Sequence, residues 1–202
     1  MLLGKTVVLG VTGSIAAYQA VDIIAELKRL GISVFVIMTK AAAKFVTPLT
    51  LRTVSQNPVV IEMFAETQNW NVQHIALADL ADLMLIAPAT ANIIGKLANG
   101  IADDMLSTTV MATKAPVVIA PAMNTNMYEN PVLQSNIEKL KMFGYEFIEP
   151  EYGKLACGYE GMGRLAKVGT IVNKVINILE GAKPITAEKE ISSKASSLTH
   201  RT

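Results

Sequence analysis

The chain has 202 residues, of which 51% are hydrophobic and 17% charged, and its formal net charge is +1. This composition predicts one globular domain, and without a basic cluster or an apolar run of about 18 residues we expect no nucleic-acid or membrane partner. The single cysteine, Cys157, excludes an internal disulfide, and with no signal-peptide pattern we expect a cytoplasmic protein. The mean hydropathy of +0.37 is high for a small monomer, which favours a homo-oligomer that buries apolar surface between subunits.

Strand and helix patterns alternate along the chain. The apolar, β-branched run Thr6–Val11 predicts a strand, and Ser33–Met38 predicts a second one. Between them apolar residues recur at helical spacing over 15–30, and Gly31 is placed to end that helix in a left-handed conformation. The alternation continues with expected strands at 83–87, 117–120 and 145–148 and expected helices at 91–98, 103–112, 131–143 and 168–179.

The expected strands are nearly continuous apolar runs, which is typical of a sheet covered on both faces. Strands that alternate with helices in this way predict an α/β fold with a doubly wound, Rossmann-like or flavodoxin-like, parallel sheet. We expect a single domain over residues 1–181, followed by a polar, flexible tail at 182–202. Ligands of such sheets bind outside the carboxyl ends of the strands, so the residues after each strand are the first site candidates.

The turn after the first expected strand, residues 10–15, favours an anion. It brings backbone amides and the Ser14 hydroxyl to a predicted helix start, where phosphate is stabilised. The turn has neither the Gly-Lys-Ser/Thr of a P-loop nor the Gly-x-Gly-x-x-Gly of a dinucleotide site. The second strand ends in Thr39 and Lys40, which suit a terminal phosphate better than a ribose. The alternative is an ordinary tight turn capped by Ser14.

Two further strand ends carry small residues together with hydroxyl or amide side chains. The third expected strand is followed by Thr90, Ala91 and Asn92, and the fourth by Ala122 and Asn124. Small residues let a flat ring approach the backbone, and polar ones supply directed hydrogen bonds. Each end alone is also compatible with a capped helix start. Because three such ends meet in the predicted crevice, they favour a bound planar cofactor.

Two other side chains are candidates for proton transfer. His74 opens an expected helical stretch, where the helix dipole favours a neutral imidazole that can act as a base, although most lone histidines are structural. Cys157 stands among glycines on an expected mobile surface segment, so a proton-donating thiol competes there with a small buried hydrophobe. Neither residue has neighbours at zinc-ligand spacing, so we expect no metal site.

Five segments in combination resemble the phosphopantothenoylcysteine decarboxylases, which belong to the homo-oligomeric flavin-containing cysteine decarboxylases. They are Gly13-Ser-Ile-Ala-Ala-Tyr18, His74, Pro88-Ala-Thr-Ala-Asn92, Pro121-Ala-Met-Asn124 with Met127, and Leu155-Ala-Cys157-Gly-x-x-Gly-x-Gly-Arg164. The Pro-Ala-Met-Asn and Ala-Cys-Gly segments in particular separate this group from flavin prenyltransferases and lantibiotic-processing decarboxylases. The resemblance extends over most of the chain before the tail.

The resemblance implies FMN as the cofactor and 4'-phospho-N-pantothenoylcysteine as the substrate, which loses CO2 to give 4'-phosphopantetheine in coenzyme A biosynthesis. The flavin is implied to oxidise the cysteine end to a thioaldehyde, so that the electrons left by CO2 enter an enethiolate that is then reduced. The residues implied to hold the phosphate are Ser14 and Thr39, and the others implied at the flavin are Gly13, Ile15, Thr90, Ala91, Asn92 and Ala122.

The same resemblance implies roles at the substrate. His74 is implied in the oxidative half of the reaction, Asn124 in orienting the carboxylate, and Met127 in substrate contact. Cys157 is implied to protonate the enethiolate carbon, because a thiol with a pKa of about 8.5 is mostly protonated near neutrality. The glycines around Cys157 imply a lid that closes over the substrate.

Partners and alternatives also follow from the resemblance. Relatives form trimers that can assemble further, and in many bacteria the domain is fused to phosphopantothenoylcysteine synthetase, so a homotrimer and that synthetase are the implied partners. Ile93, Thr90 and Tyr128 depart from the residues frequent in the family, and Ile93 removes a hydroxyl that can bond the flavin. A flavin prenyltransferase and a non-catalytic regulatory flavin-binding subunit stay open as alternatives.

Overall fold

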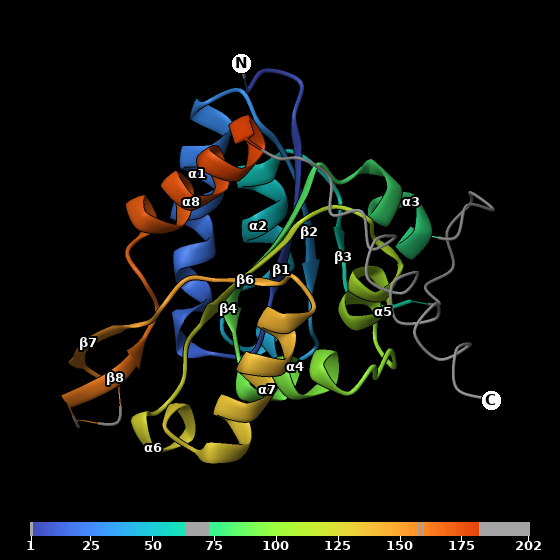
Figure 1. Ribbon diagram of the computed structural model, residues 1–202. Coiled ribbons are helices and arrows are strands. Elements are labelled where there is room, and N and C mark those ends of the chain that lie inside the picture. Colours follow the sequence, from blue (N-terminus) through green and yellow to red (C-terminus); the bar gives the residue numbers. More distant parts are fainter. Residues whose placement is uncertain (1, 64–72, 157, 159, 182–202) are drawn as a thin grey trace, which may run out of the picture.

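A six-stranded parallel sheet forms the centre of the computed structural model, which describes residues 2–63, 73–156, 158 and 160–181 (Figure 1). The strand order is β3-β2-β1-β4-β5-β6. This is the Rossmann order, so the predicted doubly wound α/β fold is confirmed and is of the Rossmann rather than the flavodoxin arrangement. The strands are β1 Thr6–Val11, β2 Ser33–Met38, β3 Val59–Val60, β4 Leu83–Ala89, β5 Val117–Pro121 and β6 Glu146–Phe147.

Successive residues of each central strand enter two different cores. In β1, Leu9 packs in the core shared with α1 (Ala20–Arg29), α2 (Pro48–Ser55) and α8 (Val168–Gly181). Its neighbour Val8 packs in the second core, on the opposite face of the sheet. The helices of that second core are α3 Gln73–Leu80, α4 Ala91–Ala98, α5 Met105–Ala112 and α7 Pro131–Met142.

The two cores fix where the sheet changes winding direction. The chain leaves β1 toward α1 on one face and leaves β4 toward α4 on the other, and Figure 1 shows these helices on opposite sides of the sheet. Since β1 and β4 are neighbours, the connections diverge from adjacent strands and leave a crevice at their carboxyl ends.

Several local predictions need correction. The helix expected over 15–30 begins as a 3-10 turn, η1 (Ile15–Gln19), before α1, although Gly31 ends it with a φ of 81° as predicted. The helix expected from 103 begins at Met105, because the Asp104 side chain accepts a hydrogen bond from the Ser107 amide and caps α5. Besides the hairpin described next, the elements that the sequence pattern did not predict are α2, β3, η2 (Ala42–Lys44) and α6 (Thr125–Tyr128).

The glycine-rich segment that carries Cys157 is more regular than expected. It forms an antiparallel hairpin of β7 (Glu151–Lys154) and β8 (Glu160–Arg164), which projects from one side of the molecule (Figure 1). Cys157 and Tyr159 lie outside the described residues, as does the tail at 182–202.

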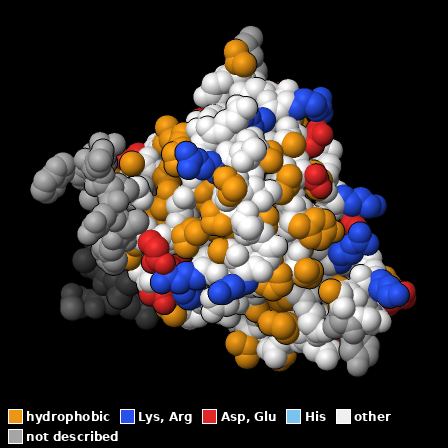
Figure 2. All heavy atoms as spheres, turned by 180° about the vertical axis from the view of Figure 1, so that it is seen from behind, with side chains coloured by type: hydrophobic (Ala, Val, Ile, Leu, Met, Phe, Trp, Pro, Cys, Tyr) orange, Lys and Arg blue, Asp and Glu red, His pale blue; other side chains and the backbone are white. Residues whose placement is uncertain are grey.

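Large apolar side chains remain on the surface of a single chain. Figure 2 shows hydrophobic side chains gathered across the face seen from behind. The most exposed are Leu3, Leu49, Val132, Met142, Phe143 and Tyr152, each at least 66% exposed. No helix among the described residues is both long and apolar enough to span a bilayer.

Candidate functional site

A buried threonine joins the two strands that flank the crevice. Thr12 directly follows β1 and is 2% exposed. Its Oγ1 donates to the Pro88 carbonyl at 2.6 Å and accepts from the Thr90 amide at 3.0 Å, so one hydroxyl satisfies groups on both sides of the β4 end. Thr12 therefore fixes the position from which Thr90 and the start of α4 face the crevice.

Thr12→Val tests this bridge. Valine has nearly the same shape but no hydroxyl, so the Pro88 carbonyl loses a donor and the Thr90 amide loses its acceptor. We expect unfolding in urea to show a loss of about 2 kcal/mol, and a ligand held by Thr90 to bind about tenfold more weakly. Thr12→Ser keeps the hydroxyl and serves as the control. Equal losses in both variants would contradict the role given to the hydroxyl.

Two cavities open on either side of the turn after β1. The first, here the sheet-edge cavity, lies at the carboxyl ends of β1, β2 and β4, where Gly13, Thr39 and residues 90–92 line about 640 Å³. The second, here the hairpin cavity, has about 710 Å³ and lies between η1, the residues after β5 and the hairpin. Gly13 lines the first and Ser14 the second, so the turn itself separates them.

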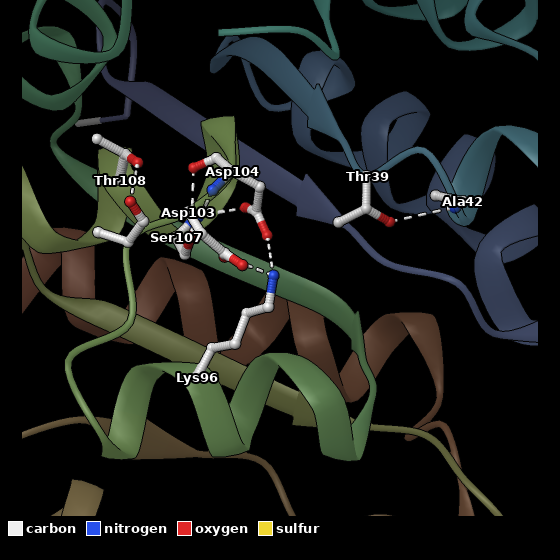
Figure 3. A network of polar contacts seen from close by, with 8 residues as sticks. Thr39, Ala42, Lys96, Asp103, Asp104, Ser107 and Thr108 are labelled. Carbon is white, nitrogen blue, oxygen red and sulfur yellow. Dashed lines mark hydrogen bonds and ion pairs between the residues drawn. The ribbon is translucent and has the colours of Figure 1, made fainter.

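The sheet-edge cavity has close-packed backbone and hydroxyl groups at one end. A Cβ on Gly13 would lie 2.5 Å from the Cβ of Ala41, so the turn contacts the start of η2 directly and leaves no room for a side chain there. Thr39 Oγ1 accepts a hydrogen bond from the Ala42 amide at 3.1 Å, which fixes the hydroxyl at this end of the cavity (Figure 3). Its own proton is the donor that a bound anion would accept.

Ion pairs form the opposite wall of the sheet-edge cavity. Lys96 reaches from α4 to Asp103 and Asp104 at 2.6 and 2.7 Å (Figure 3). Hydrogen bonds to these two carboxylates raise the pKa of Lys96. Burial alone would raise the pKa of Asp104, but hydrogen bonds from Lys96 and from the Ser107 amide outweigh it, and the net pKa is lowered. The cluster ties α4 to the N-terminus of α5 across the cavity.

Acid titration tests the strength of this cluster. A carboxyl whose pKa is lowered by folding stabilises the protein above its unfolded pKa of about 4, and that stabilisation is lost as the pH falls through the folded value. In Asp104→Asn, which keeps a capping side chain, we expect the free energy of unfolding to fall less steeply below about pH 4. Urea denaturation over a pH series measures this slope, and Asp79→Asn, on the exposed face of α3, is the control. Parallel profiles for the wild type and Asp104→Asn would contradict the assignment.

The hairpin cavity contains the residues that follow β5. Ala122 and Asn124 both line it, and Asn124 caps α6 by accepting a hydrogen bond from the Asn126 amide through Oδ1 at 2.9 Å. The hairpin docks here because Gly163 O accepts from the Met123 amide at 2.9 Å. A Cβ on Gly163, whose φ is 132°, would collide with the Met123 carbonyl oxygen, so only glycine allows this approach.

Ser14 shows both behaviours considered for the turn. Its hydroxyl oxygen accepts from the Ala16 amide at 3.3 Å and caps η1, as in the ordinary capped turn, and the residue also lines the hairpin cavity with Ile15. Lys40, expected beside a phosphate, lines the sheet-edge cavity with Thr39 and forms an ion pair with Glu62 at 2.9 Å.

The structure brings some predicted site residues together and leaves others apart. Gly13, Thr39, Thr90, Ala91 and Asn92 share the sheet-edge cavity with Met127. The hairpin cavity holds Ser14, Ile15, Ala122 and Asn124.

His74 is placed differently from the other predicted site residues. It lies in the first turn of α3, which packs against α5, and it lines neither cavity of the described chain. Cys157 lies outside the described residues.

Sequence reasoning missed Thr12 and the Lys96 cluster. A polar residue directly after the apolar run 7–11 was a usable signal for Thr12. Nothing in the pattern around Lys96 indicated the ion pairs, because they depend on how the loop between α4 and α5 turns back toward α4.

An open Rossmann-type sheet with cavities at its switch point is typical of the α/β proteins that bind small ligands outside the carboxyl ends of their strands. A family model described as Flavoprotein matches residues 1–180. The chain belongs to this flavoprotein family.

Curated relatives narrow the comparison. The chain is 49% identical over 173 residues to a probable phosphopantothenoylcysteine decarboxylase of Streptococcus mutans. The match covers 85% of this chain and 97% of that protein. It is 52% identical over 172 residues to the coenzyme A biosynthesis bifunctional protein CoaBC of Bacillus subtilis. That match covers 85% of this chain but only 42% of the relative, so the chain spans less than half of the bifunctional protein.

Solved structures agree with the sheet and its surroundings. A cysteine-to-serine variant of PPC decarboxylase complexed with pantothenoylaminoethenethiol superimposes with a TM-score of 0.80 at 29% identity, over 88% of this chain and 99% of that one. The FMN-dependent cysteine decarboxylase SpaF gives a TM-score of 0.78 at 31% identity, over 90% of this chain and all of that one.

Proposed function

We propose that this protein is an FMN-dependent decarboxylase that converts 4'-phospho-N-pantothenoylcysteine to 4'-phosphopantetheine in coenzyme A biosynthesis. The observation that carries the proposal is the pair of cavities on the two sides of one turn, with Thr39 and Asn92 in one and Asn124 in the other. A relative matched over nearly its whole length bears the name of this activity.

The sheet-edge cavity and the turn fit FMN. The lining includes the small residues Gly13, Ala41 and Ala91. The hydroxyl and amide side chains of Thr39, Thr90 and Asn92 supply directed polar groups. A volume of about 640 Å³ is typical of a site for a small organic ligand. The residues proposed to hold FMN are Gly13, Ser14, Ile15, Thr39, Thr90, Ala91, Asn92 and Ala122.

The chain's own residues have distinct tasks in this reaction. Bound FMN supplies an electron acceptor for the cysteine end of the substrate and returns the electrons after CO2 has left. Asn124, whose Oδ1 accepts from the Asn126 amide, is proposed to orient the substrate carboxylate through its side-chain amide. Cys157 donates a proton to carbon in the last step, and Met127 contacts the substrate. A cysteine-to-serine variant of a similar enzyme is known with an ethenethiol compound, which supports this order.

His74 is proposed to act as a base or positioning group from a second copy of the chain. Within one chain it lines neither cavity, while large apolar side chains are exposed on the surface. A homo-oligomer, of which a trimer is the form we propose, would cover such side chains and bring α3 of one subunit to the site of another.

Mixing two inactive variants tests this sharing. His74→Asn and Asn124→Ala each remove one group, and we expect each alone to have lost about 100-fold or more in kcat/KM. Co-refolded mixtures should regain activity, because some sites then receive His74 from an Asn124→Ala chain and Asn124 from a His74→Asn chain. Product mass measures the gain, and a mixture of His74→Asn with itself is the control. Mixtures that stay as inactive as the single variants would contradict sharing between subunits.

The proposed function is tested directly by turnover. Flavin-loaded protein mixed with phosphopantothenoylcysteine should form phosphopantetheine, followed by mass, with CO2 released in equal amount. A flavin-loaded preparation that leaves this substrate unchanged would refute the function.

A synthetase that makes the substrate is the proposed partner. One relative is named as a bifunctional protein of coenzyme A biosynthesis, and this chain matches 42% of its length. Co-purification with a phosphopantothenoylcysteine synthetase from the same cell tests the partnership.

A further inference from the structure

The two cavities differ in charge. In the sheet-edge cavity both lysines are paired, Lys40 with Glu62 at 2.9 Å and Lys96 with Asp103 and Asp104 at 2.6 and 2.7 Å. Three carboxylates against two ammonium groups leave its lining with a formal charge of −1. An anionic ligand therefore gains no net attraction from these side chains.

The hairpin cavity has the opposite character. Lys154 and Arg164 line it, and its lining, drawn from the described residues, includes no carboxylate. Neither side chain takes part in an ion pair or hydrogen bond within the described chain. The Arg164 side chain crosses the hairpin over Gly153, because its Cδ and Nη1 lie 3.6 Å from the position of a Cβ on that glycine. Two unneutralised cations thus share one cavity.

The acidic residues of the hairpin do not cancel this charge. Glu151 pairs with Arg164 in the ladder, but its carboxylate forms an ion pair with Lys167 at 3.8 Å. Glu160 is the ladder partner of Lys154, and it lies outside the cavity lining. The cations therefore face the cavity with their charge available to a ligand.

We propose that Lys154 and Arg164 bind a phosphomonoester dianion, and that this group is the 4'-phosphate of the substrate. The inference rests on the proposed function, whose substrate has a carboxylate at one end and a phosphate at the other. Asn124 lines the same cavity, and the half-exposed Ile15 and Tyr18 supply an apolar wall for the chain between the two anions. The phosphate of FMN is the other source of the same chemistry.

Substrates with and without the phosphate test whether the two cations bind the substrate phosphate or the phosphate of FMN. In Lys154→Met, Arg164→Met and the double variant, we expect kcat/KM for phosphopantothenoylcysteine to fall about tenfold per cation removed. The phosphate-free pantothenoylcysteine should react within about twofold of the wild-type rate, because it makes no contact with either cation. Lys114→Met removes an exposed cation that lines neither cavity, and it should leave both substrates unaffected.

Binding measurements keep the test independent of turnover. Calorimetry with phosphopantothenate and pantothenate should show the same phosphate-specific loss, and fluorescence titration with FMN and riboflavin should show no change between variants. A loss confined to FMN would assign the cations to the flavin phosphate. If the variants distinguish the phosphorylated from the phosphate-free ligand as well as the wild type does in every pair, the proposal is overturned. If the wild type binds phosphopantothenate through these cations but decarboxylates neither substrate, only the proposed function is overturned.

Discussion

Cys157→Ser is expected to release CO2 while forming product about 1,000-fold more slowly than the wild type. A serine hydroxyl is a far weaker acid than a thiol, so protonation of the substrate carbon becomes the slow step although the earlier steps proceed. Substrate-derived enethiol should accumulate and the flavin absorbance should stay bleached. Stopped-flow absorbance, CO2 release and product mass together measure where the reaction stops.

Cys157→Ala provides the matched comparison. Alanine has no side-chain proton donor at all, whereas serine keeps a hydroxyl. We expect the reaction of Cys157→Ala to stop at the same stage, in protein with the same flavin content. Normal phosphopantetheine formation by either variant would refute the role of the thiol as proton donor. A variant that releases no CO2 would instead place Cys157 before decarboxylation.

Gly163→Ala has the largest expected effect on the architecture of the site. The added methyl group would meet the Met123 carbonyl oxygen, and a φ of 132° is strained for alanine even with room. The hairpin must then move away from Met123 and Asn124, at a cost of about 3 kcal/mol in the free energy of unfolding. We expect kcat/KM to fall about 100-fold, because the group that orients the substrate shifts with it.

Gly169→Ala is the control for this change. A Cβ on Gly169, near the start of α8, meets no atom within 4 Å, so alanine should leave stability unchanged or raise it by up to about 1 kcal/mol. Urea denaturation of both variants gives the comparison, and activity is measured at saturating flavin. Wild-type stability and activity in Gly163→Ala would show that the hairpin docks without this contact.

The glycines of the hairpin illustrate how far composition can be interpreted. Their number predicted a lid, which stays a prediction, and the structure shows a second use of glycine: Gly161 and Gly163 are buried where β8 packs against α6 and Met123. Composition reports that the backbone lacks side chains, but it does not distinguish freedom to move from the need for close approach. At Gly161 the contact with Thr125 of α6, and at Gly163 the contact with Met123, show that close approach requires the glycine.

Local signals predicted the central strands and the residues at their ends. The runs that became β1 and β2 have the predicted bounds, because a strand buried on both faces is apolar along nearly its whole length. Since parallel strands end at the same edge, Thr39, Thr90 and Asn92 were also expected in one crevice, and they line one cavity. The two-residue strand β3 was missed because so short a run carries no periodic signal.

By itself the sequence determined the class of fold, the edge of the sheet at which a ligand binds, and the residue types available there, because burial and turn geometry act over neighbouring residues. The tertiary structure decided which of those residues share a cavity. It placed Ser14 and Asn124 apart from Thr39 and Asn92, paired Lys96 with the acids before α5, and left Lys154 and Arg164 unpaired beside Asn124. The Lys96 pairs span only seven and eight residues, but they form only because the chain turns back after α4, and the hairpin reaches Asn124 only by docking on the residues after β5. Charge pairing depends on such distances in space, which the hydrophobic pattern does not encode.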